Sequence, residues 1–169
     1  MARYGPKWGK VGDKGSSHSG FEVMRKRSML LGEHRHTVDD KGRLTVPAKF
    51  RQKLMAGMVV TRGFDHNLVI YPLDEWTKIT DRISELPYSD PDARKIRRLV
   101  YSGAANLDVD KQWRVNIPSY LLEYGRISHE VVVVGMNSFA ELWSPEDWSL
   151  SRQQMEEDQD SEHWIRLGI

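Results

Sequence analysis

The sequence predicts a mainly β protein with short helices, an α+β chain in which one small unit occurs twice. Two internal matches lead to this prediction. The segment GEHRHTVDDKGRLTVP (32–47) aligns without a gap on GAANLDVDKQWRVNIP (103–118), an offset of 71 residues. With the offset one residue longer, VVTRGFDHNLVIYPLDEW (59–76) aligns on VVVVGMNSFAELWSPEDW (131–148), which matches Gly63 with Gly135. Self-similarity of this kind indicates a duplicated unit, here of about 45 residues.

The strands of the unit show in the pattern of apolar side chains. Residues 44–46 and 115–117 alternate as half-buried strands do, and MVVTRG and EVVVVG are typical of buried strands. A further strand follows each run after turn residues, at 68–71 and 140–143, so each copy closes with a hairpin. Seven matched apolar positions are expected to be core rather than a stacking platform for bases: Leu68, Ile70, Tyr71, Trp76, Leu142, Trp143 and Trp148.

Short helices are predicted after the first strand pair of each copy. Pro47 and Pro118 suit the first helical position, where proline loses no hydrogen bond, and Gly57 and Gly125 suit the helix ends. A unit this short buries too little apolar surface to fold alone. The two copies should therefore pair about a pseudo-two-fold axis, and several chains should assemble further.

A longer amphipathic helix is predicted between the copies. Asp90 suits its N-cap and Pro91 its first turn, and a basic face follows with Arg94, Lys95, Arg97 and Arg98. The chain then divides into a basic N-terminal arm without fixed structure (1–28), a first repeat (32–78), a helical connector (79–102), a second repeat (103–150) and an acidic C-terminal tail (151–169).

Charge is spread unevenly along the chain, although the net charge is only +1. Residues 1–28 carry seven Lys and Arg against two acidic residues, and residues 34–62 again carry seven against two. Residues 144–169 carry the opposite balance, seven Asp and Glu against two Arg. A local basic excess attracts polyanions, which makes a nucleic acid a candidate partner.

Composition excludes several classes of protein. The 169 residues are 29% charged and 39% apolar, which is typical of a soluble protein. Without cysteine the chain has no disulfide, thiolate zinc site or Cys nucleophile, in keeping with a reducing compartment. No apolar run reaches the roughly 18 to 20 residues that span a bilayer, and the first 28 residues lack a signal-peptide core. We expect a cytoplasmic protein without a membrane segment.

The motif that repeats most plainly is D-x-x-x-R, Asp39 to Arg43 and Asp110 to Arg114, at a turn before a strand. Arginine presents a planar fork that bonds two acceptors at once, such as phosphate oxygens or guanine O6 and N7, and a nearby Asp can hold it extended. The alternative is that each pair only staples its own hairpin, since ion pairs at turns are common and weak.

The quoted segments resemble the MraZ transcriptional regulators from about Met29 to Trp148, with both D-x-x-x-R loops in order. The resemblance implies two tandem AbrB-like (SpoVT-AbrB) units in a swapped-hairpin, double-split β-barrel, assembled into ring-like homo-oligomers. It implies binding to double-stranded DNA at promoter direct repeats, generally to repress the cell-division and cell-wall gene cluster, and thus a nucleoid association. The DNA-binding residues it implies are Arg43, Arg114, Lys41 and Lys111, with Asp39 and Asp110 as motif partners.

One position departs from the family pattern. Trp113 stands before the second arginine, where the first loop has Gly42. A turn with positive φ penalises Trp. The sequence therefore predicts either a different turn in the second loop or an exposed Trp113 that stacks on DNA or on a neighbouring subunit.

Other functions are weighed against this one. No phosphate-binding Gly loop, G-x-S-x-G or H-E-x-x-H occurs, so we expect no enzyme, no cofactor and no small-molecule substrate. His34 and His36 lie on one strand face and could ligate a metal, but solvent-facing strand residues are the better interpretation. An antitoxin-like protein-interaction module with the same fold, without specific DNA readout, stays open as the main alternative.

Overall fold

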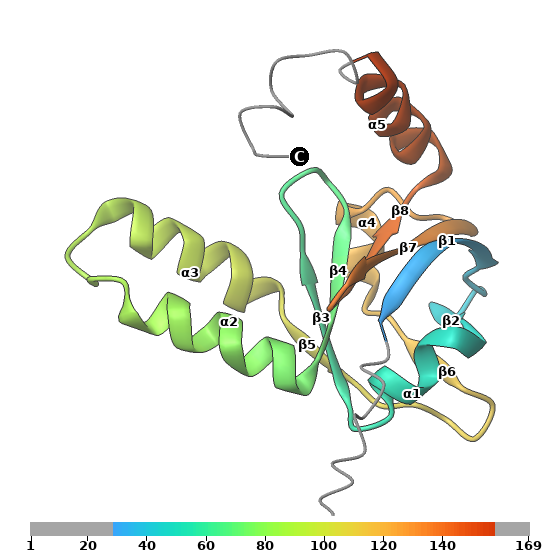
Figure 1. The fold of residues 1–169 in the computed structure, drawn as a ribbon, viewed down its shortest axis with the longest axis horizontal. Coiled ribbons are helices and arrows are strands. Elements are labelled where there is room, and N and C mark those ends of the chain that lie inside the picture. The colour runs from blue at the N-terminus through green and yellow to red at the C-terminus, as the bar shows by residue number, and fades with distance from the viewer. Residues whose placement is uncertain (1–28, 158–169) are drawn as a thin grey trace, which may run out of the picture.

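The computed structural model describes residues 29–157 of the chain. It is mainly antiparallel β-structure with short helices, as predicted (Figure 1). In chain order the elements are β1 (Leu30–Thr37), β2 (Arg43–Thr45), η1 (Ala48–Phe50), α1 (Arg51–Leu54), β3 (Met58–Arg62), β4 (Leu68–Pro72), α2 (Leu73–Glu85), α3 (Pro91–Gly103), β5 (Ala105–Leu107), β6 (Arg114–Asn116), α4 (Ser119–Tyr124), β7 (Glu130–Asn137), β8 (Ala140–Trp143) and α5 (Pro145–Glu157).

The two copies interleave within one sheet. Its strand order is β1-β7-β8-β4-β3-β5, so the β7–β8 hairpin of the second copy lies between β1 and β4 of the first. The β3–β4 hairpin in turn lies between β8 and β5. Each strand can be replaced by its counterpart in the other copy, β1 by β5, β3 by β7 and β4 by β8 and the reverse. The strand order then reads the same from the opposite edge of the sheet. The predicted swapped hairpins and pseudo-two-fold arrangement are therefore confirmed.

The remaining two strands form a separate ribbon. β2 pairs with β6 in antiparallel fashion, with Leu44 opposite Val115. Both side chains are buried and join one core with residues of the six-stranded sheet and of the helices that follow each ribbon strand. Among residues 29–157 the strand pairing does not close into a barrel, so the expected barrel takes the form of an open sheet and a ribbon around a shared core.

The structure corrects the internal alignment at one strand. In β3–β4 Val60 pairs with Ile70, and in β7–β8 Val133 pairs with Leu142. The offset between β3 and β7 is thus 73 residues rather than the 72 that β4 and β8 share, because the second hairpin loop is one residue shorter. A slip of one residue turns side chains to the other face of a sheet. The predicted match of Gly63 with Gly135 is therefore wrong.

The helix predictions hold with small shifts. Pro47 and Pro118 lie one position before the first helical residue, and Gly125 caps α4 as expected. The Asp90 side chain accepts a hydrogen bond from the Asp92 backbone N–H at the start of α3. Helix α2 was not predicted as a separate helix. It begins inside the predicted first repeat, runs into the predicted connector and pairs with α3 as a helical hairpin (Figure 1).

The α2–α3 hairpin packs on the outer face of β3 and β4. The buried Thr61 hydroxyl donates to the Val100 carbonyl at 2.7 Å and joins β3 to α3. Of the seven apolar positions expected in the core, Leu68, Ile70, Leu142 and Trp143 are buried. Tyr71, Trp76 and Trp148 are half-buried on the outer side of the sheet.

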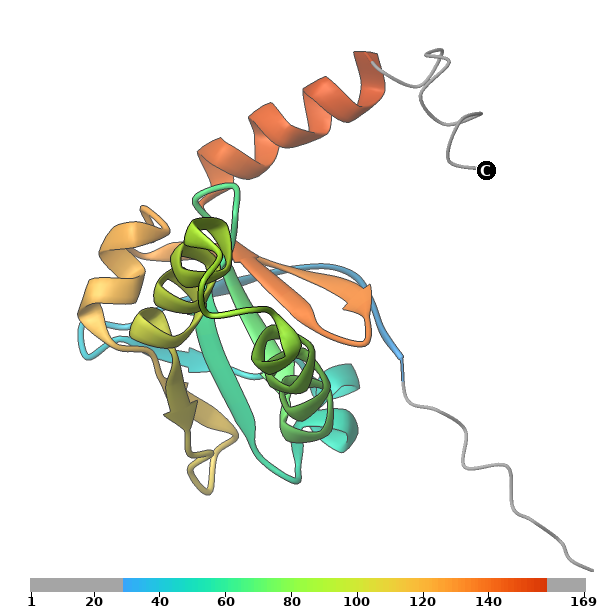
Figure 2. The ribbon, with the colours of Figure 1, turned by 90° about the vertical axis from the view of Figure 1, so that its left-hand side faces the viewer.

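Helix α5 extends away from the sheet (Figure 2) and has no buried residue. It forms the described part of the predicted acidic tail. The predicted basic arm, residues 1–28, and the tail beyond Glu157 lie outside the described residues. Between residues 29 and 157, no helix is long and apolar enough to cross a membrane.

Candidate nucleic-acid interface

The first D-x-x-x-R motif forms a closed turn before β2. Oδ1 of Asp39 accepts the backbone N–H groups of Lys41 and Arg43, both at 3.0 Å. Oδ2 accepts Nε and Nη2 of the Arg43 guanidinium, both at 2.7 Å. One carboxylate therefore fixes the backbone turn with one oxygen and the arginine side chain with the other.

The second motif repeats this geometry before β6. Oδ1 of Asp110 accepts the backbone N–H groups of Gln112 at 2.8 Å and Arg114 at 2.9 Å. Oδ2 accepts Nε and Nη2 of Arg114, both at 2.8 Å. Each Asp–Arg pair therefore does hold its own turn. Whether the arginines also bind a ligand depends on where their side chains lie.

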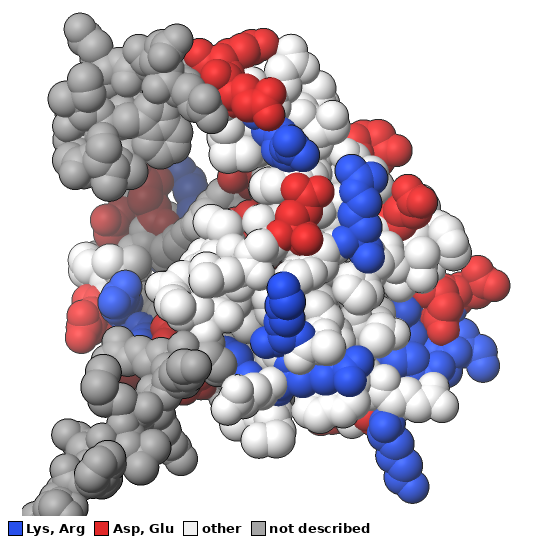
Figure 3. Space-filling model, turned by 45° about the vertical axis from the view of Figure 1, so that its right-hand side comes forward, with Lys and Arg blue, Asp and Glu red and all other residues white. Residues whose placement is uncertain are grey.

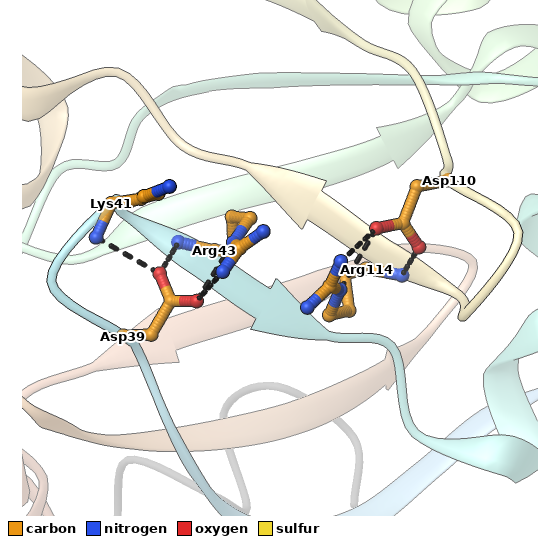
Figure 4. Close-up of polar contacts among 5 residues, drawn as sticks. All are labelled: Asp39, Lys41, Arg43, Asp110 and Arg114. Atoms are coloured by element: carbon orange, nitrogen blue, oxygen red, sulfur yellow. Dashed lines mark hydrogen bonds and ion pairs between the residues drawn. The ribbon is translucent and has the colours of Figure 1, made fainter.

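Both arginines lie on one face of the ribbon. In the β2–β6 register Arg43 is opposite Asn116, and Arg114 is opposite Thr45. Side chains alternate along a strand, so these four residues share a face while Leu44 and Val115 fill the core on the other. Arg43 and Arg114 are diagonal neighbours, which places such residues roughly 7–8 Å apart. Figure 4 shows the two guanidinium groups between the two carboxylates.

The hydrogen bonds to aspartate leave one edge of each guanidinium open. A guanidinium has five N–H donors in a rigid fork, and each aspartate engages one N–H on Nε and one on Nη2. The terminal edge formed by Nη1 and the second N–H of Nη2 points away from the carboxylate. That edge can bond two coplanar acceptors side by side, as in guanine or a phosphate.

The ion pairs fix the charge state of the site. Hydrogen bonds from the Arg43 guanidinium and backbone hold the pKa of Asp39 at about 2. The backbone N–H and then the side chain of Arg114 lower the pKa of Asp110. The bond to Asp39 raises the pKa of Arg43, and the charge of Asp110 adds to this effect across the ribbon. Asp39, Asp110 and Arg43 are therefore ionised at neutral pH.

Trp113 adopts the same turn as Gly42, so the first of the two alternatives for this loop, a different turn, is wrong. Both residues have positive φ, +60° for Trp113 and +76° for Gly42. The Trp113 ring is half-buried and carries the Arg51 guanidinium at 5.4 Å from its centroid. A cation over an aromatic face is favourable, and this contact offsets part of the backbone strain.

Only glycine fits the corresponding place in the first loop. A Cβ on Gly42 would lie 2.8 Å from the Ile117 carbonyl oxygen and 3.5 Å from Leu122. By the 71-residue offset Leu122 is the counterpart of Arg51, so the two loops share a backbone and differ in what packs beside them. The two halves of the site are consequently not equivalent in shape.

The two lysines occupy different places in their loops. Lys41 is the second residue after Asp39, whereas Lys111 directly follows Asp110, and Gln112 takes the place that Lys41 has in the first loop. Both lysine side chains are exposed. Figure 3 shows Lys and Arg side chains gathered toward the lower edge and right of the molecule. Thr45 and Asn116, which the motif did not reveal, share the ribbon face with the arginines.

The two histidines are less exposed than expected. His34 and His36 lie on the same side of β1 as the buried Leu30, and both are half-buried. The His34 ring packs edge-on against Phe50, with centroids 5.1 Å apart. Burial, and then the neighbouring His34, lower the pKa of His36. Within residues 29–157 no group of three or more metal-ligating side chains occurs.

The fold and this site define a tandem-repeat β protein that presents a pair of carboxylate-held arginines on a two-stranded ribbon. Comparison with known proteins then identifies the family. Two copies of the family model described as "MraZ protein, putative antitoxin-like" match residues 29–99 and 100–166. The chain belongs to the MraZ family.

Relatives of known name are similar over most of the chain. A protein of Herpetosiphon aurantiacus named "Transcriptional regulator MraZ" is 52% identical over 71% of this chain and 84% of its own length. Proteins of the same name from Thermomicrobium roseum and Desulfitobacterium hafniense are 44% and 41% identical, over 72% and 83% of this chain and 85% and 100% of theirs.

Proposed function

We propose that this chain is a sequence-specific DNA-binding transcriptional regulator that reads base edges with Arg43 and Arg114. The name that its relatives carry supports regulation of transcription. The observation that carries the DNA-reading hypothesis is the ribbon face. Two guanidinium groups lie on it side by side, each fixed by a carboxylate and each with its terminal edge open.

The size of the ribbon suits the major groove. That groove admits a two-stranded β-ribbon, and arginine paired with guanine O6 and N7 is the commonest specific contact there. The exposed Lys41 and Lys111 flank the arginines and supply phosphate contacts, which set affinity more than sequence preference. Aspartates at this face repel phosphates that approach from the wrong register, which favours a fixed docking geometry.

The finer hypotheses come from the family resemblance. The protein binds direct repeats in a promoter as a ring-like homo-oligomer and represses the cell-division and cell-wall gene cluster by excluding polymerase. It acts in the cytoplasm at the nucleoid, without cofactor or catalysis. Joining several ribbons in one assembly raises affinity through effective concentration, so one chain need bind only weakly.

The test is a fluorescence-anisotropy titration of the full chain against its own upstream promoter and a scrambled duplex, at two salt concentrations. Arg43→Ala and Arg114→Ala are each expected to weaken promoter binding by about 1–3 kcal/mol. Arg98→Ala is the matched control, because Arg98 is exposed on α3, away from the ribbon. Equal binding by all four proteins, checked for the same oligomer mass, contradicts the proposal.

A second candidate is a protein-interaction module. The description of the matching family as antitoxin-like favours it. Such a module needs the fold without the open arginine edges, and it shows no preference for the promoter and no steep salt dependence of DNA binding. The same titration therefore separates the two functions.

A further inference from the structure

A cavity lies between the α2–α3 hairpin and the outer face of the sheet. The hairpin is on the side of the molecule away from β2 and β6 (Figure 1). It has a volume of about 370 Å³, within the range of small-molecule sites. Ile79, Ile83, Ile96 and Val100 of the two helices form its apolar wall. The sheet and its hairpin loops supply the opposite wall, where a carboxylate, a side-chain amide and a pair of aromatic rings line the cavity.

The first of these groups is Glu141, in the middle of β8. Its partner across the β4–β8 ladder, and its counterpart in the other repeat, is Val69. A carboxylate therefore occupies the place that an apolar side chain has in the related half of the fold, at a cost in desolvation. Burial raises the pKa of Glu141, hydrogen bonds from the Trp143 and Asn67 side chains oppose this effect, and the charge of Asp65, which also lines the cavity, adds to it. The Trp143 bond runs from Nε1 to Oε2 at 2.9 Å, and a carboxylate with two donors can still accept further hydrogen bonds.

The second group is the side-chain amide of Asn67, which is 1% exposed. Its Oδ1 accepts no hydrogen bond from any residue between 29 and 157. An unpaired buried acceptor is costly and rare in folded proteins. Asn67 and Glu141 line the same cavity, and the Asn67 side chain hydrogen-bonds the Glu141 carboxylate and so helps to hold it in place.

The third group is aromatic. The rings of Tyr71 and Phe139 also line the cavity, with centroids 5.2 Å apart. Aromatic faces attract cations, and they do so more strongly where water is excluded. A carboxylate held by Trp143 and Asn67, with two rings and apolar helices beside it, suits an ammonium group attached to an apolar body.

We propose that this cavity binds a small apolar amine, with the ammonium group on Glu141 and the apolar body between the helices and the Tyr71 and Phe139 rings. The site is separate from the ribbon and does not depend on DNA binding. Two arginines, Arg62 and Arg82, also line the cavity. Arg62 donates to the Ser102 hydroxyl and lies over the Tyr124 ring, 5.5 Å from its centroid. Arg82 is exposed and pairs with no acidic residue in the described part of the chain.

The test uses three probes of matched shape, 2-phenylethylamine, 2-phenylethanol and 3-phenylpropionate, in an NMR titration of the full chain with labelled methyl groups. The amine is expected to shift the methyl signals of Ile79, Ile83 and Val100 saturably. The alcohol should bind about tenfold more weakly, since it loses one charge-assisted hydrogen bond, and the carboxylate more weakly still.

Two variants make the test specific. Glu141→Gln keeps the shape of the side chain and should lower affinity for the amine about tenfold without changing that for the alcohol. Glu123→Gln, an exposed carboxylate on α4, is the control and should change neither. Should Glu141→Gln lose the folded spectrum, Phe139→Leu replaces it and should weaken the amine more than the alcohol.

Four results overturn the proposal. They are equal affinity for all three probes, no saturable shift of these methyl signals, amine binding unchanged in Glu141→Gln, or cavity signals that respond to protein concentration instead of probe. The last result would mean that a second copy of the chain covers the cavity. An affinity for 3-phenylpropionate above that for the amine is a fifth result, and it contradicts the proposed class of ligand.

Discussion

Arg43 and Arg114 are long side chains that each lie along one carboxylate. An exposed ion pair of this kind adds little to the free energy of unfolding. Its effect is on position, because a guanidinium bonded at Nε and Nη2 has lost most of its rotamer freedom before a ligand arrives, and binding then costs less entropy. We therefore expect Asp39 and Asp110 to matter more for ligand binding than for stability.

The low pKa of Asp39 makes the free energy of unfolding depend on pH, and the direction of that dependence can be worked out. Arg43 holds the pKa of Asp39 at about 2, below the roughly 3.9 of a carboxyl in the unfolded chain. Because the folded-state pKa is the lower one, the stabilisation is fully present above about pH 4 and is lost as the pH falls through the folded pKa. A carboxyl-carbon NMR titration should place the Asp39 midpoint near 2, and Asp39→Asn should remove this acid-side loss of stability. A midpoint like that of a free carboxyl contradicts the geometry.

Gly42→Ala tests the turn of the first loop. The added Cβ would lie 2.8 Å from the Ile117 carbonyl oxygen, in a residue with φ of +76°. The free energy of unfolding should fall by about 1–3 kcal/mol, measured by urea denaturation. Gln112→Ala, an exposed residue in the other loop, should leave it unchanged. Equal stability of both variants would show that the loop relaxes freely.

At this scale the sequence predicted the site in part. Duplication of D-x-x-x-R identified the four charged residues, because the same turn chemistry was used twice. The conformation of Trp113 was beyond sequence reasoning, since its positive φ is compensated by Arg51, a residue of the other repeat. The ribbon face shared by the two arginines followed from strand register, which no local pattern specifies.

At the scale of elements, the ribbon strands have three residues each and cannot be stable alone. The core beneath the ribbon holds it in place. Leu44→Ala should lower the free energy of unfolding by about 2–5 kcal/mol, because Leu44 is almost fully buried. Leu31→Ala, at a side chain 52% exposed on β1, is the control and should change it by less than about 0.5 kcal/mol. If Leu44→Ala lowered the free energy of unfolding as little as Leu31→Ala does, the result would contradict the packing of the ribbon on the core.

β2 and β6 were predictable from alternating apolar residues, β3 and β7 from continuous β-branched runs, and α3 from its Asp-Pro start. Helix α2 directly follows β4, and Trp76 was expected in the core because it matches Trp148 of the second copy. Trp76 lies instead on α2, where its ring packs against the Tyr71 ring with centroids 5.9 Å apart. The one-residue slip between β3 and β7 depends on hairpin loop length, which an ungapped alignment cannot show.

At the scale of the whole molecule, most of the strand pairing joins one repeat to the other. β1 pairs with β7, β2 with β6, β3 with β5 and β4 with β8. A chain of residues 29–99 alone should therefore have no cooperatively folded monomer and should be unfolded or form a dimer in which a second copy replaces the missing repeat. Circular dichroism with light scattering measures this, and a folded monomer would contradict the interleaved fold.

The central claim is that the ribbon reads bases with two arginine forks. Replacing both residues together, Arg43→Lys and Arg114→Lys, keeps the charge and removes the fork. The measurement is the ratio of affinities for the promoter and a scrambled duplex, taken across a range of salt concentrations. The ratio should fall by at least about tenfold while the salt dependence stays the same. An unchanged ratio would mean that the arginines contact phosphate only, or that the ribbon does not bind DNA, and would contradict the claim.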